Sequence, residues 1–451
     1  MNLATDKTIA ILGLGLTGLS CARYFTSLGK SFVMIDESPA ALRVDQFREE
    51  FPDSRLISGK LEEDDLIGFN TIVVSPGISL DVPALRRAQV AGSDITGDIA
   101  LFRQEANAPV IAITGSNGKS TVTRWLGEMA ERSGRLVGVG GNIGTPALDL
   151  LLDDKEYDLY VLELSSYQLE RTPLLAAHAA AFLNLSPDHL DRYPDIMSYH
   201  AAKQRIFRGC HHMVCNRKDR LTQPLVAKDA SLATFALSSP DLKEYGVVGK
   251  GENAYLAKGP QRLLPVTAIS LPGKHNIENA LASLALGDAA GLPMATMLEV
   301  LSDFHGLPHR CQPIAEIAGV TYIDDSKGTN VGATIAAVEG LSLTAHDIVL
   351  IAGGVGKDAD FGPLVELAPA LKHVLLMGQA ARDIGIVLEP VVACTYVEDM
   401  SAAVATARQL ASADDRVLLS PACASFDMFA NFEERGEVFS GLVLGMQGGA
   451  I

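Results

Sequence analysis

The chain has 451 residues, 48% of them hydrophobic and 20% charged, and its 54 acidic residues outnumber 37 basic ones to give a formal charge of −17. This composition excludes a largely disordered chain, and the negative field argues against a nucleic-acid partner. The length exceeds what one hydrophobic core supports, and about 150 residues per domain predicts three domains.

Neither export nor membrane anchoring is expected. The six cysteines lack the paired spacing of a disulfide framework, which is typical of a reducing compartment. Residues 1–7 carry an acid ahead of any apolar stretch. No apolar run reaches the roughly 18 residues that a membrane-spanning helix needs. The sequence therefore predicts a cytoplasmic protein that binds no membrane, and we expect it to be a monomer.

Short apolar runs alternate with helical patterns along the chain, which predicts an α/β fold with parallel sheets and crossover helices. In the first segment, residues 8–12, 31–36 and 71–75 are predicted strands, and residues 19–28 are a predicted helix that ends at Gly29. These elements form a small doubly wound, Rossmann-like unit with a boundary near residue 97.

A glycine fingerprint lies between the first predicted strand and helix. It runs from Gly13 to Gly18, and Asp36 ends the next strand. Small residues let the backbone approach a diphosphate, and the helix N-terminus supplies partial positive charge. Alone, the motif is typical of a nicotinamide-dependent oxidoreductase, with a purely structural turn as the alternative. Ser75 to Gly77, after the third strand, form either a second wall of this crevice or a plain turn.

A second phosphate loop opens the central segment. It spans Thr114 to Thr121, between a predicted strand at 110–114 and a predicted helix at 120–133. Backbone N–H groups of such a loop wrap a polyphosphate, Lys119 neutralises its β and γ oxygens, and a hydroxyl at Ser120 or Thr121 reaches Mg²⁺. Ile113 stands where the general motif has its first glycine, so the loop is a variant.

Polar side chains follow two later strands of the central segment. Strands are predicted at 159–164, 179–184 and 211–215, hairpins at 235–271 and a helix after His275. Glu163 comes at the end of the first of these strands, where a carboxylate can face Mg²⁺, with an ordinary surface glutamate as the alternative. Asp188 and His189 follow the second strand, at the expected carboxyl edge of the sheet. Lys203 has no role that its position alone reveals.

The last segment begins after a Gly-Leu-Pro stretch at 306–308, because Gly and Pro punctuate elements. Strands are predicted at 320–324, 348–352, 374–377 and 417–419. Clusters of cations and hydroxyls follow or flank these strands, so their ends can converge on one face and suit anionic ligands. The clusters are residues 309–310, 324–330, 353–357 and 420–426.

Taken together, these motifs resemble the Mur ligase family over essentially the whole chain. The resemblance is carried, in chain order, by Thr114 to Thr121, Glu163 before Ser-Ser-Tyr-Gln-Leu, residues 188–193, Lys203, residues 273–276 and residues 307–310. Three further parts are most similar to the branch that adds D-glutamate: residues 13–18, 325–327 and 420–434.

The resemblance implies three domains: a Rossmann-like domain at 1–97 that holds a UDP-sugar, a P-loop ATPase domain at 98–306, and a Rossmann-like domain at 307–451 that brings the amino acid. It implies that ATP phosphorylates the carboxylate of UDP-N-acetylmuramoyl-L-alanine and that D-glutamate attacks the acyl phosphate, in cytoplasmic peptidoglycan precursor synthesis. An NAD-dependent oxidoreductase and another Mur-type or folylpolyglutamate-type ligase remain the alternatives.

The resemblance also assigns residues to roles. It makes Lys119, His189, Lys203 and Lys327 catalytic. The ATP-binding residues are Gly115, Ser116, Asn117, Gly118, Lys119, Ser120, Thr121, Asn276, Asn279, Arg310 and Asp325. Two Mg²⁺ ions are held by Ser120, Glu163, His189 and Lys203, the last as a carbamate formed with CO₂. The substrate-binding residues are Leu16, Thr17, Asp36, Ser75, Gly77, Asn142, His189, Lys327, Thr329, Lys357, Ser425, Phe426 and Phe432. Glu37-Ser38 stand where some relatives have a hydroxyl and a cation, which leaves the uracil and diphosphate contacts there open.

Overall fold

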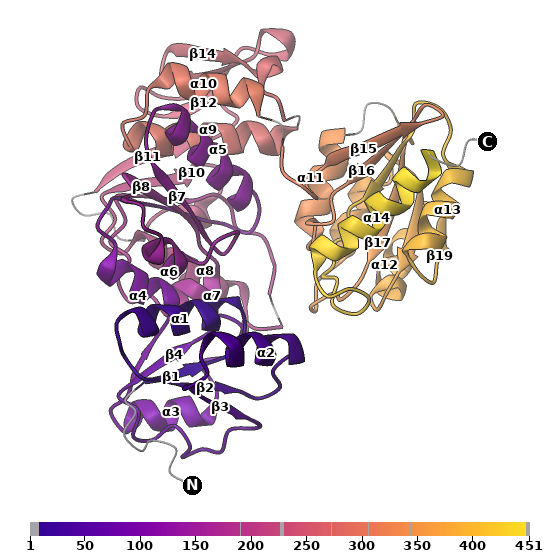
Figure 1. The fold of residues 1–451 in the computed structure, drawn as a ribbon. Coiled ribbons are helices and arrows are strands. Elements are labelled where there is room, and N and C mark those ends of the chain that lie inside the picture. Colours follow the sequence, from indigo (N-terminus) through magenta and orange to yellow (C-terminus); the bar gives the residue numbers. More distant parts are fainter. Residues whose placement is uncertain are drawn as a thin grey trace.

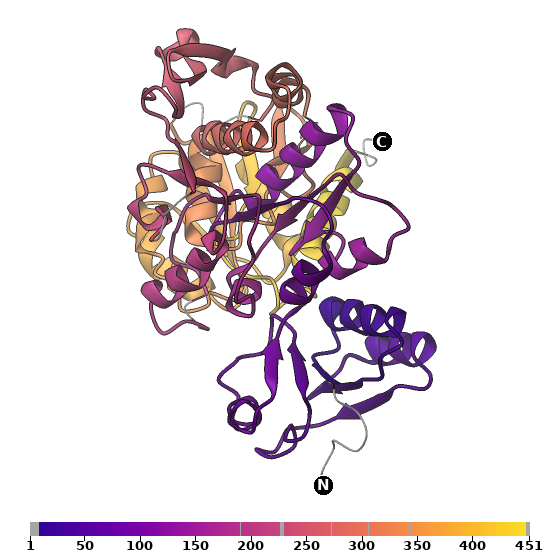
Figure 2. The same cartoon turned by 90° about the vertical axis from the view of Figure 1, so that its left-hand side faces the viewer.

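The computed structural model describes residues 9–189, 191–225, 230–271, 273–304, 306–341 and 345–447. Three sheets of five, nine and six strands follow one another along the chain, each with helices packed on it (Figure 1). In both views the N-terminal domain lies at one end of the central domain, away from the strands near residue 260 (Figures 1 and 2). The C-terminal domain stands beside the central domain in Figure 1. The predicted α/β fold in three domains is confirmed, while the exact boundaries stay a prediction.

The N-terminal sheet is parallel, with strand order β3-β2-β1-β4-β5. Its strands are β1 Ile9–Leu12, β2 Val33–Asp36, β3 Arg55–Ser58, β4 Thr71–Val74 and β5 Asp94–Thr96. Its helices are α1 Leu16–Ser27, α2 Ala41–Glu50 and α3 Pro83–Val90. The strand order reverses between β1 and β4, and ligands of such sheets bind in the crevice at that switch point. The glycine fingerprint and Ser75 to Gly77 follow these two strands.

The predicted helix at 19–28 is wrong at its start, because α1 begins at Leu16. Gly15 is its extended N-cap and Gly18 lies inside its first turn. A Cβ on Gly18 would collide with the carbonyl oxygen of Gly13, and a Cβ on Gly13, whose φ is +96°, would lie 2.8 Å from the Cβ of Ser75. The glycines therefore let the helix start directly against β1 and β4, which places Leu16 and Thr17 on its first turn.

The central sheet has the order β14-β13-β12-β11-β10-β9-β6-β8-β7. Its strands are β6 Val110–Thr114, β7 Val137–Gly141, β8 Leu159–Glu163, β9 Ala179–Phe182, β10 His212–Asn216, β11 Ser231–Phe235, β12 Tyr245–Val248, β13 Tyr255–Lys258 and β14 Gln261–Pro265. Its helices are α4 Asp98–Glu105, α5 Lys119–Arg132, α6 Ala147–Leu152, α7 Ser166–Glu170, α8 Ile196–Gln204, α9 Lys274–Ala289 and α10 Met294–Asp303. The predicted hairpins are β12 to β14, which pair antiparallel. The remaining pairs are parallel, so β6, β8 and β9 all end at the same edge.

The C-terminal sheet has the order β15-β16-β20-β17-β18-β19. Its strands are β15 Gln312–Ile317, β16 Val320–Asp324, β17 Ile348–Gly353, β18 Leu371–Met377, β19 Cys394–Tyr396 and β20 Arg416–Leu419. Its helices are α11 Val331–Leu341, α12 Ala381–Leu388, α13 Met400–Leu410 and α14 Phe432–Gln447. Apolar clusters cover both faces of this sheet, as expected for buried parallel strands. The antiparallel edge strand β15 was not predicted from the sequence, because its apolar pattern is weak.

Short 3₁₀ helices complete the described elements: η1 Arg205–Phe207, η2 Arg220–Thr222, η3 Gly251–Asn253, η4 Val266–Ala268 and η5 Gly362–Leu367. Across the described ranges, none of the helices combines the length and the apolar character that crossing a membrane requires.

Candidate active site

Two clefts meet where the three domains come together. The fingerprint cleft, of about 670 Å³, is lined by residues of the glycine fingerprint, Ser75 to Ile78 and the loop after β7. The phosphate-loop cleft, of about 620 Å³, is lined by residues 116–120, the end of β8, residues of the segments that follow β8 and β9, and C-terminal residues. Gly77, Ser120, Asn142, Arg310 and Lys327 line both clefts. The two clefts are therefore one continuous site.

The phosphate loop is held in shape by polar contacts to the loop after β9. The backbone N–H of Asn117 donates to the side-chain oxygen of Asn184 at 2.8 Å, and the hydroxyl of Ser116 donates to the carbonyl of Ser186 at 3.0 Å. Gly118 adopts φ +84°, and a Cβ there would collide with the amide oxygen of Asn279. The loop ends at the first turn of α5, where free backbone N–H groups and the helix dipole favour an anion.

Lys119 lies under this loop. Its ammonium donates to the carbonyl oxygens of Gly115 and Ser116, each at 2.9 Å. Burial lowers its pKa, and the nearby carboxylates of Glu163 and Asp188 oppose that shift. The ammonium therefore lies at the loop, bonded to two of its carbonyl oxygens.

Glu163, at the end of β8, is bonded to two predicted site residues, and a third contacts one of these two. Its carboxylate accepts a hydrogen bond from the Ser120 hydroxyl at 2.5 Å and one from the Asn142 amide at 2.8 Å. Arg310 donates to the same Ser120 hydroxyl at 2.6 Å. Burial raises the pKa of Glu163, but Lys119 and the hydrogen bonds from Ser120 and Asn142 outweigh burial and lower it overall. An ionised carboxylate beside a hydroxyl suits one Mg²⁺ that also binds phosphate oxygens.

His189 and Lys203 line the same cleft as the loop. Burial is the main cause that lowers the pKa of His189 to about 4. Its imidazole is therefore neutral near pH 7, which is the metal-binding form. Lys203 is 1% exposed, donates to the Gly115 carbonyl at 2.8 Å and lies 4.7 Å from the centre of the Tyr199 ring. Burial and the charge of Lys119 lower its pKa well below the usual value.

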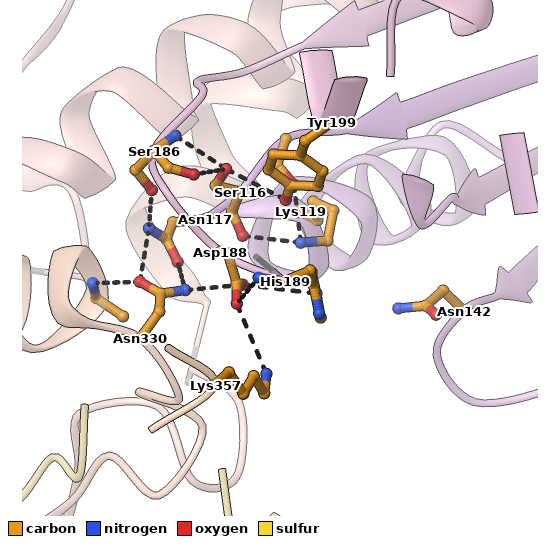
Figure 3. Close-up of polar contacts among 12 residues, drawn as sticks. Ser116, Asn117, Lys119, Asn142, Ser186, Asp188, His189, Tyr199, Asn330 and Lys357 are labelled. Atoms are coloured by element: carbon orange, nitrogen blue, oxygen red, sulfur yellow. Dashed lines mark hydrogen bonds and ion pairs between the residues drawn. The ribbon is translucent and has the colours of Figure 1, made fainter. Parts of the chain in front are cut away.

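Asp188 connects the central domain to the C-terminal domain (Figure 3). Its carboxylate lies 3.6 Å from both the Lys357 ammonium and the His189 ring nitrogen. Asn330 donates to the Asp188 carboxylate at 3.3 Å and to the amide oxygen of Asn117 at 3.1 Å. Asn117 in turn donates to Asn330 at 3.4 Å. The side chain of Asn117 is thus turned toward the C-terminal domain rather than into its own loop.

Within the described part of the chain, no group of three or more His, Cys, Asp and Glu side chains is arranged to hold a metal ion. Mg²⁺ in nucleotide sites characteristically uses one or two carboxylates together with substrate phosphates and water. Glu163 with Ser120, and His189 near Asp188, fit that pattern, because each offers part of a ligand set.

Lys327 and Asp325 follow β16. The Lys327 ammonium lies 3.7 Å from the centre of the Phe432 ring, and burial lowers its pKa to about 8. Burial raises the pKa of Asp325 to about 7, although its carboxylate accepts a hydrogen bond from Ser420 at 2.7 Å. Ser420 follows β20, which pairs with β16. The ends of these two strands therefore bring the clusters at 324–330 and 420–426 together, as the sequence predicted.

The structure brings most of the predicted site residues to these clefts. The fingerprint cleft is lined by Leu16, Thr17, Ser75, Gly77, Asn142 and Phe432. The phosphate-loop cleft is lined by His189, Lys203, Lys327, Thr329, Lys357, Ser425, Phe426 and Phe432. An adjoining pocket is lined by Asn117, Gly118, Thr121, Asn276, Asn279, Arg310 and Asp325. Asp36 differs from them, because its carboxylate is bonded to the backbone N–H groups of Leu14 at 2.6 Å and Ser38 at 2.9 Å.

Sequence reasoning missed several side chains of the site. Asn330 lies inside the cluster 324–330 but was given no role, and Asn184 and Tyr199 were not singled out. Asn184 holds the phosphate loop through both its amide oxygen and its amide nitrogen. Asparagine side chains belong to no recognisable motif. The only signal for Asn330 was that it follows Lys327 and Thr329 closely in the sequence.

Family models match three successive parts of the chain. Residues 7–97 match "Mur ligase MurD-like, N-terminal domain", residues 113–287 match "Mur ligase middle domain", and residues 309–423 match "Mur ligase, glutamate ligase domain". Over 445 residues the chain is 48% identical to the UDP-N-acetylmuramoylalanine--D-glutamate ligase of Marinobacter nauticus, which covers 98% of this chain and 99% of the relative. The chain belongs to the Mur ligase family. The resemblance seen in the sequence is confirmed.

A second curated relative and two solved structures are also similar to this chain. A protein of the same name from Hahella chejuensis is 50% identical over 446 residues, which is 97% of this chain and 98% of the relative. Among solved structures, the UDP-N-acetylmuramate-alanine ligase MurC of Thermotoga maritima has a TM-score of 0.62 at 18% identity and covers 97% of this chain and 99% of its own. A pseudomurein peptide ligase type C from Methanothermus fervidus has a TM-score of 0.61 at 15% identity, covering 98% and 100%. These two structures show the shared fold.

Proposed function

We propose that this chain is an ATP-dependent ligase that adds D-glutamate to UDP-N-acetylmuramoyl-L-alanine through an acyl phosphate, in cytoplasmic synthesis of peptidoglycan precursors. The observation that carries the proposal is the continuity of the two clefts at Ser120, Asn142 and Lys327. A fingerprint suited to a diphosphate and a loop suited to a triphosphate would then serve one reaction. A nicotinamide-dependent oxidoreductase needs the first of these but has no use for the second. The name shared by relatives about half identical to this chain supports the same substrates.

The reaction must bring several anions together. A triphosphate, the L-alanyl carboxylate and D-glutamate repel one another, and cations placed in advance offset that repulsion in a site from which water is excluded. Lys119, Arg310 and Lys327 line the phosphate-loop cleft and are such cations. Bound Mg²⁺, held by Ser120 and Glu163 on one side, would neutralise further phosphate charge.

Lys203 and His189 would hold a second Mg²⁺. An ammonium would repel the ion, whereas a neutral lysine amine that adds CO₂ and loses a proton becomes a carbamate, which binds a cation as a carboxylate does. The Lys203 amine is buried beside the phosphate loop and bonded to a carbonyl rather than to a carboxylate. We propose that this residue is carbamylated in the active protein.

D-glutamate would bind where the C-terminal domain faces the phosphate-loop cleft. Its two carboxylates need cations and N–H or O–H donors. Lys357, Thr329 and Ser425 offer them, and Phe426 and Phe432 flank the same cleft. Lys357 already pairs with Asp188, so the amino acid would enter beside His189.

The test is phosphate release from ATP and UDP-N-acetylmuramoyl-L-alanine with a panel of D- and L-amino acids. Among the amino acids of the panel, we expect only D-glutamate to cause phosphate release. Mass spectrometry should then show a product with the mass of the D-glutamyl adduct. Release with another amino acid would assign the chain to a different Mur ligase reaction. Hydrolysis without any amine acceptor would contradict the ligase proposal.

A further inference from the structure

The wall that the N-terminal domain contributes to the fingerprint cleft has no described lysine or arginine side chain that could bind an anion. This wall is made of residues 13, 15–17 and 75–78, which bring backbone N–H groups and hydroxyls. Among the described residues that line it from the N-terminal domain, none is a lysine or an arginine. The neighbouring strand β2 is followed by Glu37, a negative charge. A diphosphate bound here would need its counter-charge from another part of the chain.

The central domain presents one cation to this cleft from helix α5. Arg124 is exposed and lines the cleft. It lies four residues after Ser120, which lines the same cleft, so the two side chains share one face of the helix. The Arg124 guanidinium lies 3.4 Å from the position that a Cβ on Gly144 would occupy. Its charged end is therefore at the loop after β7, where Asn142 also enters the cleft.

Among the described cations that line this cleft, Arg124 is the one with no hydrogen bond, ion pair or aromatic-ring contact. Arg310 donates to Ser120, and Lys327 lies over the Phe432 ring. His309 is bonded to the Asp324 carboxylate at 2.7 Å. Arg124 makes no hydrogen bond or ion pair with any residue that the structure describes. The arginine guanidinium can form two parallel hydrogen bonds to phosphate oxygens. An arginine without a partner can do so without first breaking another contact.

We propose that Arg124 binds the diphosphate of the UDP-linked substrate, opposite the N–H groups of the glycine fingerprint. This inference rests on the proposed function, because it names the part of that substrate which the residue contacts. Helix α5 then holds phosphate at two places: its first turn faces the triphosphate loop, and its second turn faces the substrate diphosphate. The UDP-linked substrate would in consequence tie the N-terminal domain to the ATP-binding domain.

The experiment uses the full chain and compares wild type with Arg124→Gln and Arg124→Lys. Arg132→Gln is the matched control, because Arg132 is an exposed arginine of the same helix that pairs with Asp303, outside the clefts. The dissociation constant of UDP is measured by calorimetry, and KM values are measured for ATP and for UDP-N-acetylmuramoyl-L-alanine. Thermal melting checks that each variant is folded.

We expect Arg124→Gln to weaken UDP binding and raise the KM of the UDP-linked substrate by about tenfold or more, as for a lost hydrogen bond to a charged group. The KM of ATP should stay within about twofold, Arg124→Lys should retain part of the affinity, and Arg132→Gln should match wild type. Higher salt should weaken UDP binding more in wild type than in Arg124→Gln.

Unchanged UDP affinity in folded Arg124→Gln would overturn the proposal. If UDP binding is unchanged while the KM of the full substrate rises, the residue contacts the sugar or the alanyl carboxylate, and the diphosphate assignment is wrong. Wild type that binds UDP but forms no D-glutamyl product would count against the proposed reaction, whereas the UDP titrations would still decide the role of Arg124.

Discussion

Four cations, Lys119, Lys203, Arg310 and Lys327, line the phosphate-loop cleft together. Burial lowers the pKa of Lys119, Lys203, Arg310 and Lys327, and for the three lysines repulsion from neighbouring cations adds to that effect. Glu163 and Asp188 offset part of the charge. Such a site gains most from a ligand that brings several negative charges at once.

Lys119→Ala should leave the chain folded but almost inactive. Removing one preorganised donor typically lowers kcat by roughly 10²- to 10³-fold. Phosphate release measures activity, and circular dichroism measures folding. Lys155→Ala, which removes an exposed lysine paired with Asp153, is the control and should keep full activity. Substantial ligation by folded Lys119→Ala would count against the proposed role.

Lys203→Ala should lose activity and regain part of it when a short-chain carboxylic acid is added, because the acid replaces the carbamate. Lys119→Ala should gain nothing from the same acid. In wild type, ¹³C-labelled CO₂ should give a carbamate signal in the NMR spectrum that Lys203→Ala lacks. No labelled signal and no rescue at any acid concentration would exclude carbamylation as the role of this lysine.

Activity should fall on the alkaline side as Lys327 loses its proton. Burial lowers the pKa of this lysine to about 8, so the ammonium is present below that pH and lost above it. The pH profile of kcat/KM reports the groups of the free protein. We expect its alkaline limb near that value, and Lys327→Arg should move the limb to higher pH. An alkaline limb that Lys327→Arg leaves in place would assign it to another group.

At the scale of elements, both proposed anion sites lie at a short turn between a strand and a helix. The fingerprint joins β1 to α1, and the phosphate loop joins β6 to α5. Each turn needs glycine at the point where its backbone touches a neighbouring element. The sequence predicted that a turn lies at each of these places, although it placed the start of α1 too late, because strand, glycine pattern and helix are all local features.

Gly118→Ala should impair ATP binding more than strain alone explains. Gly118 has φ +84°, and a Cβ there would collide with Asn279. Gly134, with φ +83° and open space around it, is the matched control, because Gly134→Ala adds backbone strain without a collision. We expect an increase of about tenfold or more in the dissociation constant of ATP for Gly118→Ala, from about 1 to 3 kcal/mol of strain plus a displaced loop. Equal ATP affinity in the two variants would show that the collision is relieved.

At the scale of the whole molecule, the C-terminal domain contacts the phosphate loop and the segment that follows β9. Arg310 reaches Ser120, Lys357 reaches Asp188, and Asn330 exchanges amide hydrogen bonds with Asn117. Asn330 also accepts a hydrogen bond from the backbone of Ala333 at the start of α11. The same contacts that close the two domains therefore orient the helix that follows Thr329.

Asn330→Ala should raise the KM of D-glutamate and lower kcat by about 3- to 10-fold each, because a net contribution of about 0.5 to 1.5 kcal/mol per hydrogen bond is lost from domain closure. The dissociation constant of ATP should change little. Asn253→Ala, in the exposed turn η3, is the control. A change confined to ATP affinity would show that Asn330 acts on the nucleotide rather than on closure.

The sequence alone predicted the α/β class, the two glycine-rich turns between strand and helix, and the family, since the motifs that indicate them are runs of residues close together along the chain. The start of α1 was placed too late, because Gly18 was taken as part of the turn although it lies in the helix. Tertiary structure alone decided that Asn117 meets Asn330, 213 positions away, and that Arg124 enters the fingerprint cleft. The physical reason is that such contacts depend on how the domains pack against one another, and the spacing of residues along the chain does not record that arrangement.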